Sequence, residues 1–412
     1  MLSIDYLRQN KEKVIKAAKN KRRPIELEKI FSLDDQRKKL IFKIQKLREE
    51  RNKLSKIKPS EEQIKQVQTI KQELKSLENQ LKDIEKELNF LLLQIPNVPL
   101  DQVPSDNNKE IKHWGKIPHF NFPFQSHIQL GKALDIIDLD RGSKISGYRG
   151  YFLKKQGAQL HLAVLTYAFN KLIKKGYIPL IAPAIVKEFT LVGSGQFPWG
   201  KTDVYKIDED DSYLAGTAEV PVTAYFANEI LAEKDLPLKF VALSPCFRKE
   251  AGAYGKDTRG LYRLHEFWKV EQVVIANNNL EEALKIHQEL QKNSEEIIEE
   301  LGLPYRVMLM SIADLGEPQV IKYDLEAWMP SRNNYGEIGS NSLMADFQTR
   351  RLNIKFRKKN GQKEYCFSLN NTALASPRIL IPLLEINQQK DGSVLIPEVL
   401  TDYLGFKKIS LT

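Results

Sequence analysis

The sequence predicts an α+β protein in which a largely antiparallel sheet domain follows an antiparallel helical hairpin. Two patterns support this prediction. Between Val67 and Ile95, apolar residues recur at alternating steps of three and four, which is the heptad spacing of a coiled coil. From about residue 117, strand-like segments follow one another through irregular connections with few βαβ alternations, and this order favours antiparallel pairing. A chain of 412 residues can hold one large and one smaller domain.

The helical hairpin is predicted from two heptad seams. The stronger seam covers residues 67–95, and a weaker one covers residues 33–54. Pro59 lies between them and ends the first helix, because proline has no backbone N–H to donate. Two seams joined by a short turn fold back on each other. We therefore expect a coiled-coil arm over about residues 33–94, within an N-terminal domain of residues 1–100.

The first helix of this arm is strongly basic. Residues 36–58 contain ten Lys or Arg residues and only Glu49 and Glu50 as acids, in a chain whose formal net charge is +10. Charge alone leaves two interpretations open. The surface is either a solvated coiled-coil face or a contact for a phosphate backbone.

The second domain is predicted over residues 117–412, after a polar linker over residues 101–116. An apolar-periodic helix over residues 156–175 is followed by a buried strand, "YIPLIAPAIV". Later in the domain, alternating segments predict a hairpin that turns on Asn360-Gly361.

Composition excludes several classes of protein. Cys246 and Cys366 are the only cysteines, and no Cys-x-x-Cys or Cys/His cluster is present, so neither a disulfide framework nor zinc is expected. No apolar run approaches the roughly 18 residues that a membrane span requires. The N-terminus, "MLSIDYLRQNKEK", lacks the apolar core of a signal peptide, so we expect a cytoplasmic protein without a membrane partner.

One motif, "GQFPWGKT" at residues 195–202, matches the phosphate-binding pattern G-x-x-x-x-G-K-[ST]. Such a loop needs small residues whose backbone N–H groups wrap a phosphate, between a buried strand and a helix. Here Phe197, Pro198 and Trp199 fill the loop, and Pro198 has no N–H to offer. We therefore expect a chance match.

The segment "CFRKEAGAYGKDTRGLYRLHEFWKVE", residues 246–271, predicts a long antiparallel hairpin with a basic, glycine-rich loop. Because strand residues alternate between faces, Arg248 and Glu250 share one face of the first strand, and Phe267 and Glu271 share one face of the second. This brings an arginine fork for phosphate, an aromatic plate and two carboxylates to one surface. A solvated hairpin with ordinary surface charges is the alternative interpretation.

This hairpin resembles motif 2 of class II aminoacyl-tRNA synthetases, in the form carried by the seryl-tRNA synthetase family. Other segments resemble the same family in its order along the chain: "GYIPLIAPAIV" for the dimer-forming motif 1, "AGTAEVPV" for the serine loop, "EIGSNSLMADFQTRR" for the metal-binding strand and "SLNNTALASPR" for motif 3. The N-terminal hairpin is similar to the arm with which this family grips the long variable arm of serine tRNA. The resemblance covers essentially the whole chain.

The resemblance implies a class II synthetase catalytic domain that binds ATP as substrate together with Mg²⁺. Three residues would be catalytic, with Arg248 at the α-phosphate and the serine carboxylate, Arg378 at the γ-phosphate, and Glu337 at the metal. Glu337 and Ser340 would be the protein ligands of Mg²⁺. The implied ATP-binding set also includes residues that read or stack on adenine, and comprises Arg248, Lys249, Glu250, Phe267, Glu337, Ile338, Gly339, Ser340 and Arg378.

The resemblance also implies a site for L-serine. Its members would be Thr217, Ala218, Glu219, Arg248, Glu271, Asn370 and Thr372. Thr217 and Glu219 would receive the ammonium group, whereas Glu271 and Thr372 would bind the hydroxyl group. A site built around a hydroxyl rejects alanine, because its own buried polar groups would stay unpaired.

The implied partners are tRNA(Ser), bound by the basic arm and the 251–260 loop, and a second copy of the chain in a homodimer. The resemblance extends to tRNA(Sec) as a further acceptor. Six positions depart from the family's usual residues: Gly339, Leu343, Asn371, Ala373, Pro377 and Pro382. We expect Pro382 to alter the path of the motif 3 helix, because a proline inside a helix costs about 3 kcal/mol or more.

Two alternatives to a serine-activating synthetase remain at this point. One is a paralogue that activates an amino acid without charging tRNA, and the retained basic arm argues against it. The other is a non-enzymatic coiled-coil nucleic-acid binder, for which the hairpin, the Thr-x-Glu loop and Arg378 have no explanation.

Overall fold

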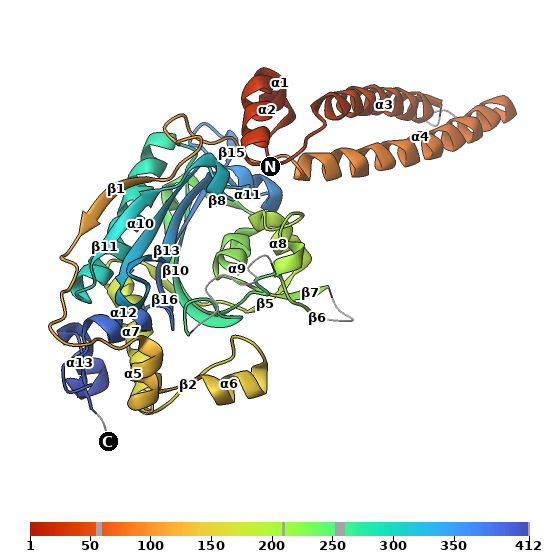
Figure 1. Ribbon diagram of the computed structural model, residues 1–412. Coiled ribbons are helices and arrows are strands. Elements are labelled where there is room, and N and C mark those ends of the chain that lie inside the picture. The colour runs from red at the N-terminus through yellow and green to blue at the C-terminus, as the bar shows by residue number, and fades with distance from the viewer. Residues whose placement is uncertain (55–59, 208–210, 252–259, 411–412) are drawn as a thin grey trace. The chain divides into compact units, whose positions relative to one another are not determined.

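The computed structural model describes residues 1–54, 60–207, 211–251 and 260–410. These residues divide into two compact units, Met1–Val98 and Pro99–Thr412 (Figure 1). The first unit is helical, and the second combines a large sheet with helices, so the predicted α+β class is confirmed.

The first unit contains the predicted helical hairpin. Its helices are α1 (Ile4–Gln9), α2 (Lys11–Asn20), α3 (Leu27–Leu54) and α4 (Glu61–Leu93). Ion pairs join Lys29 to Glu87 and Lys43 to Glu73, so α3 and α4 run in opposite directions. Between them, Ile44 packs against Ile70, Leu74 and Leu77, which belong to the predicted seams. The coiled-coil arm is therefore confirmed, while Pro59 lies outside the described residues.

The second unit is built on an eight-stranded sheet. In spatial order its strands are β1 (Lys109–Trp114), β11 (Tyr305–Leu309), β12 (Ile321–Met329), β13 (Asn334–Ala345), β16 (Phe367–Ser376), β10 (Glu266–Ala276), β9 (Leu238–Phe247) and β4 (Ile178–Ile181). All neighbouring pairs are antiparallel except β9 and β4, which are parallel. The largely antiparallel sheet was predicted correctly.

Two long helices cover one face of this sheet. They are α7 (Lys155–Lys174) and α10 (Leu280–Glu300), and both contact β16. From β10, Val270 and Val274 enter the same core as apolar residues of the two helices. Because strand residues alternate, the odd-numbered residues of β10 face the opposite side, which is left for the candidate site.

Shorter elements surround the sheet. They include the helices α5 (His127–Ala133), α6 (Leu139–Ser146), α8 (Glu188–Ser194), α9 (Glu219–Thr223), α11 (Phe347–Leu352), α12 (Leu380–Ile386) and α13 (Glu398–Leu404), and the 3₁₀ turn η5 (Pro330–Arg332). They also include the strands β5 (Ile185–Lys187), β7 (Ser212–Leu214), β14 (Lys355–Arg357) and β15 (Lys363–Tyr365). The hairpin between β14 and β15 turns at Gly361, whose φ of 85° suits glycine. This turn was predicted from the sequence.

Three sequence expectations need correction. The segment 101–116, expected as a linker, contains β1, which pairs with β11 at the sheet edge. The strand expected to be buried near residue 180 is the edge strand β4, where Ile178 is 44% and Ile181 77% exposed. Pro382 is the third residue of α12, in the first turn, where helical N–H groups have no partner within the helix. Its effect on the motif 3 helix is therefore smaller than expected.

The structure also supports the interpretation that the phosphate-binding pattern at residues 195–202 is a chance match. This segment follows α8 and leads into a three-residue 3₁₀ turn, Lys201–Asp203. It therefore has neither the preceding strand nor the following α-helix that a phosphate-binding loop requires.

Candidate active site

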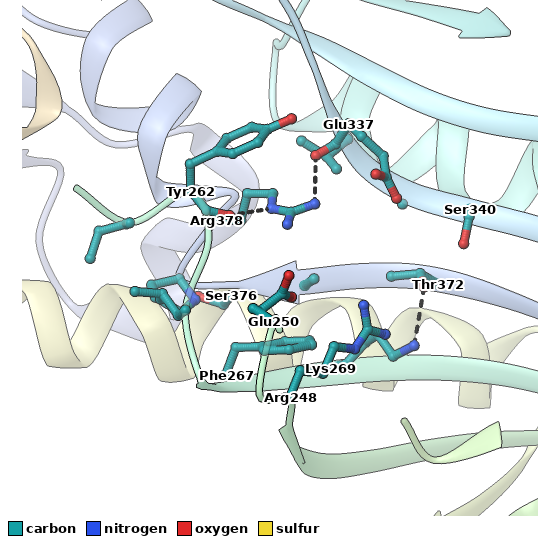
Figure 2. Close-up of a pocket in the computed structure, with 16 residues that line it drawn as sticks. Arg248, Glu250, Tyr262, Phe267, Lys269, Glu337, Ser340, Thr372, Ser376 and Arg378 are labelled. Carbon is teal, nitrogen blue, oxygen red and sulfur yellow. Dashed lines mark hydrogen bonds between the residues drawn. The ribbon is translucent and has the colours of Figure 1, made fainter. Parts of the chain in front are cut away.

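A polar pocket opens on the face of the sheet opposite α7 and α10, where β10, β13 and β16 meet the segments that flank the central hairpin (Figure 2). Its lining comes from four regions of the chain. The lining residues are Arg248, Glu250, Leu261, Tyr262, Leu264, Phe267, Lys269, Glu337, Ile338, Gly339, Ser340, Thr372, Ala375, Ser376, Pro377 and Arg378. The sheet thus gathers residues that lie up to 130 positions apart in the sequence, from Arg248 to Arg378.

Arg248 is held at the end of β9 by the loop that precedes α9. Its Nε donates to the carbonyl oxygen of Gly216 at 3.2 Å, and its guanidinium lies 5.2 Å from the centre of the Phe267 ring. The neighbouring Phe247 N–H donates to the carbonyl of Ala215 at 3.0 Å. These bonds fix the guanidinium beside the aromatic ring while leaving part of it facing the pocket.

Glu250 reaches the pocket by a different route from the one predicted. Strand β9 ends at Phe247, and Glu250 has a φ of 53°, so strand alternation does not apply to it. Its carboxylate instead forms an ion pair with Arg263. Asp203 holds the same segment through its carbonyl, which accepts from the Lys249 N–H, and through its carboxylate, which accepts from the Ala251 N–H.

Lys249 is not brought into the pocket with the other predicted ATP-binding residues. Its ammonium group lies 5.5 Å from the centre of the Tyr205 ring, and the residue is exposed. The loop at 251–260, predicted to contact tRNA, lies mostly outside the described residues, which resume at Gly260.

A buried polar cluster lies deeper in the site. Lys269, which is 5% exposed, forms an ion pair with Glu271 at 2.5 Å. The Lys269 ammonium also donates to the hydroxyl of Thr217 at 2.8 Å and to that of Thr372 at 3.3 Å. The carboxylate of Glu271, 1% exposed, accepts from Thr372 at 3.4 Å. One ammonium group therefore holds three of the residues that the resemblance assigns to serine.

Lys269 is the site residue that sequence reasoning missed. It lies between Phe267 and Glu271 on β10, and the alternation that places those two residues on one face also places Lys269 there. Strand alternation alone therefore indicates Lys269 as a site residue.

Glu219 begins α9 beside this cluster. Its carboxylate accepts from the Gln348 amide at 2.7 Å. Burial, together with the negative charge of Glu271, raises the pKa of Glu219 to about 7. The carboxyl group thus changes charge near neutral pH, and a positively charged ligand would favour its ionised form.

Arg378 and Glu337 form the other end of the pocket. Arg378 donates through Nη1 to the carbonyl oxygen of Glu337 at 2.9 Å and through Nε to that of Tyr262 at 2.8 Å (Figure 2). Burial alone would raise the pKa of the Glu337 carboxyl group, but the positive charges led by Arg378 and Lys322 hold it below its ordinary value. Glu337 is therefore an ionised carboxylate on β13, on the same strand as Ser340.

Two of the unusual motif positions have a structural explanation. At Gly339 an added Cβ would lie 2.9 Å from the carbonyl oxygen of Thr372, so the close approach of β13 and β16 favours glycine. Asn371 points away from the pocket, and its Oδ1 accepts from Ser294 on α10 at 2.5 Å and from Gln272 at 3.1 Å. It therefore belongs to a polar contact between sheet and helix.

Asn370 lies on β16 two residues before Thr372 and is 5% exposed. Within the described part of the chain, its Nδ2 finds no hydrogen-bond acceptor. A buried amide donor without a partner is costly, and it marks a place where a ligand oxygen can bind.

Comparison with known proteins finds matching families for both units of the chain. Residues 1–99 match the family model described as the seryl-tRNA synthetase N-terminal domain, and residues 203–387 match the tRNA synthetase class II core domain (G, H, P, S and T). A serine–tRNA ligase from Deinococcus radiodurans is 39% identical and is covered over 99% of both chains. One from Treponema denticola is 40% identical, over 99% of this chain and 100% of the relative. This chain belongs to the seryl-tRNA synthetase family. It is therefore a ligase of the class II aminoacyl-tRNA synthetases.

Solved members of the seryl-tRNA synthetase family share the structure over its full length. The crystal structure of seryl-tRNA synthetase from Pyrococcus horikoshii complexed with ATP is 36% identical, with a TM-score of 0.91 and complete coverage of both chains. The cytoplasmic serine–tRNA ligase from Naegleria fowleri in complex with AMP is 31% identical, with a TM-score of 0.88 over 100% of this chain and 99% of the other. A prolyl-tRNA synthetase from Giardia lamblia, at 15% identity and a TM-score of 0.58, shares the fold alone.

We expect the buried ion pair of Lys269 and Glu271 to stabilise the folded protein. Lys269→Met leaves the Glu271 carboxylate buried without a counter-ion, and this should lower the thermal unfolding midpoint by about 5 °C or more. The double variant Lys269→Met/Glu271→Gln removes the uncompensated charge and should recover most of the loss. Calorimetry compares the two variants, and equal midpoints would show that the ion pair has no such role.

Proposed function

We propose that this protein activates L-serine with ATP and Mg²⁺ to form seryl-adenylate and transfers the seryl group to the 3′ end of tRNA(Ser). The observation that carries the proposal is the gathering of Arg248, Glu337 and Arg378 in one pocket, next to a buried cluster suited to an amino acid. The full-length similarity to a synthetase solved with ATP supports the same reading. The proposal extends to tRNA(Sec) as a second acceptor.

ATP binds along the pocket in this proposal. Phe267 supplies a ring for adenine to stack on, and Glu250 offers a carboxylate oxygen to its amino group. Arg248 and Arg378 are the cations for the phosphates, since a guanidinium binds phosphate through paired N–H groups. The strand residues Ile338 and Gly339 complete the wall beneath the nucleotide. The exposed Lys249 lies outside the pocket and would contact ATP from there.

The residues present fit a Mg²⁺ ion that arrives with ATP. Glu337 offers an ionised carboxylate and Ser340 a hydroxyl oxygen, both in the pocket lining. Among the described residues, no group of three or more His, Cys, Asp or Glu side chains could hold a metal ion by itself. Mg²⁺ typically binds one or two carboxylates plus substrate phosphates, so phosphate oxygens and water would complete its coordination. When bound, the ion neutralises phosphate charge.

In this proposal serine binds beside the Lys269 ammonium and contacts the same buried residues. Thr217 and Glu219 accept the substrate ammonium beside Ala218, while Glu271 and Thr372 bind the hydroxyl group. The unpartnered Nδ2 of Asn370 is a donor for a substrate oxygen. Alanine would leave the hydroxyl-binding groups buried and unpaired, which is the physical basis for rejecting it.

The first chemical step needs alignment and charge neutralisation instead of a general base. The serine carboxylate is already ionised near neutral pH, so its oxygen can attack the α-phosphorus directly. A new oxygen–phosphorus bond forms as the bond to the leaving pyrophosphate breaks, and the arginines stabilise the charge that develops. In the second step a ribose hydroxyl of the tRNA attacks the carbonyl carbon, and AMP leaves.

The helical arm of the first unit is the proposed tRNA contact. On α3, seven basic side chains are exposed: Lys29, Lys38, Lys39, Lys43, Lys46, Arg48 and Lys53. A row of cations on a rod matches the phosphate backbone of a nucleic acid. The loop at 251–260 remains a second proposed contact.

A homodimer is proposed on the basis of exposed apolar side chains in the second unit. Ile178 and Ile181 on the edge strand β4, Ile185 on β5, Phe189 on α8 and Leu162 on α7 are all at least 44% exposed. A contiguous exposed apolar patch marks an interface, and we propose that these side chains form one.

No helix among the described residues is long and apolar enough to cross a membrane. We place the protein in the cytoplasm, with the translation machinery.

The proposed function is tested by two assays on one set of variants. Lys39→Glu/Lys46→Glu/Lys53→Glu should retain serine-dependent ATP–pyrophosphate exchange but raise the KM for tRNA(Ser) at least about tenfold, because these side chains would face phosphates. The matched control reverses the charge of three exposed lysines of the second unit: Lys359, Lys363 and Lys390.

The wild-type protein tests the proposal as a whole. Exchange without aminoacylation would support the paralogue that activates an amino acid without charging tRNA, and absence of exchange would refute the proposal.

Serine binding should depend on pH through Glu219. The ammonium of serine favours the ionised carboxylate, so proton uptake by Glu219 as the pH falls through about 7 opposes binding. The KM for serine should therefore rise about tenfold from pH 8 to pH 6. Glu219→Gln has no charge to titrate, and its KM should be higher but nearly flat, which also controls for titration of ATP. Parallel profiles for the two proteins would contradict the assignment of Glu219.

A further inference from the structure

A buried hydrogen-bonded chain leads from α12 to the pocket, and none of the roles described above uses it. It starts at Glu385, in the last turn of α12, which is 0% exposed. The Glu385 carboxylate accepts from the His127 N–H at 2.9 Å and from the Ser331 N–H at 2.9 Å. It also accepts from the Ser331 hydroxyl at 2.7 Å and lies 2.7 Å from Nδ1 of His127. One carboxylate therefore joins the starts of α5 and η5 to α12.

The Glu385 carboxyl group is ionised in this setting. Burial alone would raise its pKa, but the hydrogen bonds from His127 and Ser331 hold the pKa below its ordinary value. A charged, fully buried carboxylate must keep its donors, because each lost donor leaves part of the charge unsatisfied. Glu385 is thus a firm anchor for the imidazole.

The geometry assigns a single tautomer to His127. The backbone N–H of Leu261 lies 3.2 Å from Nε2, and a backbone N–H can only donate. Nε2 is therefore the acceptor, and the ring hydrogen is on Nδ1, where it points to Glu385. The imidazole bridges a carboxylate on one side and the main chain of Leu261 on the other.

The chain of contacts returns to α12 through the ATP pocket. Leu261 and Tyr262 both line the pocket, and the carbonyl of Tyr262 accepts from Arg378 Nε at 2.8 Å. Arg378 lies two residues before α12, the helix that carries Glu385. The contacts therefore form a closed circuit from Arg378 through α12, Glu385, His127 and residues 261–262.

The main chain runs tightly against the imidazole in this circuit. Gly260 has a φ of 70°, and a Cβ added there would lie 2.0 Å from Nε2 of His127. The path of residues 260–262 is therefore set by contact with the ring as well as by the hydrogen bond to it.

We propose that His127 is a positioning residue for Arg378, acting through the main chain of Leu261 and Tyr262. His127 itself is not in the pocket lining. By holding the Leu261 N–H, it fixes the Tyr262 carbonyl that orients the Arg378 guanidinium toward the nucleotide phosphates. The inference rests on the proposed function, in that Arg378 is taken to bind ATP.

Two substitutions of His127 separate positioning from simple structural support. In His127→Asn the amide nitrogen lies near the position of Nδ1, so it can donate to Glu385, but no acceptor reaches Leu261. In His127→Gln the amide lies near the position of Nε2, so its oxygen can accept from Leu261, but the donor to Glu385 is lost. Ser331→Ala is the matched control, because it removes a donor to the same carboxylate and leaves the Leu261 contact intact.

Calorimetric titration with ATP gives a readout that does not require catalysis. His127→Asn should weaken ATP binding about tenfold, the equivalent of one buried hydrogen bond, and should also lower the thermal midpoint, because the buried Leu261 N–H loses its acceptor. Its KM for serine in the exchange assay should stay within about twofold. His127→Gln and Ser331→Ala should also have lower thermal midpoints, but their ATP affinity should stay within about threefold of that of the wild type.

Unchanged ATP affinity in His127→Asn would overturn the inference. So would equal losses of ATP affinity and thermal midpoint in all three variants, which indicate structural support alone. Wild-type protein that binds ATP without serine-dependent exchange would refute the proposed function, while the ratio of ATP affinities would still decide the role of His127. Wild-type protein that does not bind ATP would refute both.

Discussion

The guanidinium of Arg378 donates to two main-chain carbonyls, those of Tyr262 and Glu337, and the rest of the site depends on this pair of hydrogen bonds. One carbonyl belongs to the segment entering β10 and the other to β13, while Arg378 itself follows β16. Three regions distant in sequence are thereby held at one end of the pocket. Because these carbonyls become neighbours only when the sheet has assembled, this end of the pocket and the sheet form together.

The charged groups in the pocket lie beside partners within the protein itself. At the inner end, the Lys269 ammonium engages Thr217, Glu271 and Thr372. At the outer end, Glu337 lies among positive charges led by that of Arg378. A substrate that carries an ammonium, a hydroxyl and phosphates has a counterpart for each of these groups. In the proposed complex, each polar group of the substrates would therefore meet a polar partner.

Local periodicity predicted the parts of the structure that obey a single period. The heptad spacing predicted the packing of α3 on α4. The alternation of strand residues between faces correctly predicted that Phe267 and Glu271 share one face of β10. The same rule failed for Glu250, because β9 ends before it and its φ is positive. Lys269 followed the rule but was overlooked. The register that pairs β13 with β16 and the circuit through His127 are contacts between distant segments, which no local pattern encodes.

Segments at the sheet edges were the least predictable. β1 reads as a polar linker because all six of its residues are exposed, and only pairing with β11 makes it a strand. β4 reads as buried because it is apolar, although it lies at the opposite edge. In both cases hydropathy does not report where the strand lies in the sheet.

The most direct test of the proposed site is a crystal structure of this protein with ATP and Mg²⁺ bound. The proposal predicts adenine on the Phe267 ring, the α-phosphate within hydrogen-bond distance of Arg248, and the γ-phosphate within hydrogen-bond distance of Arg378. A nucleotide bound elsewhere, or a triphosphate in this pocket that contacts neither arginine, would contradict it.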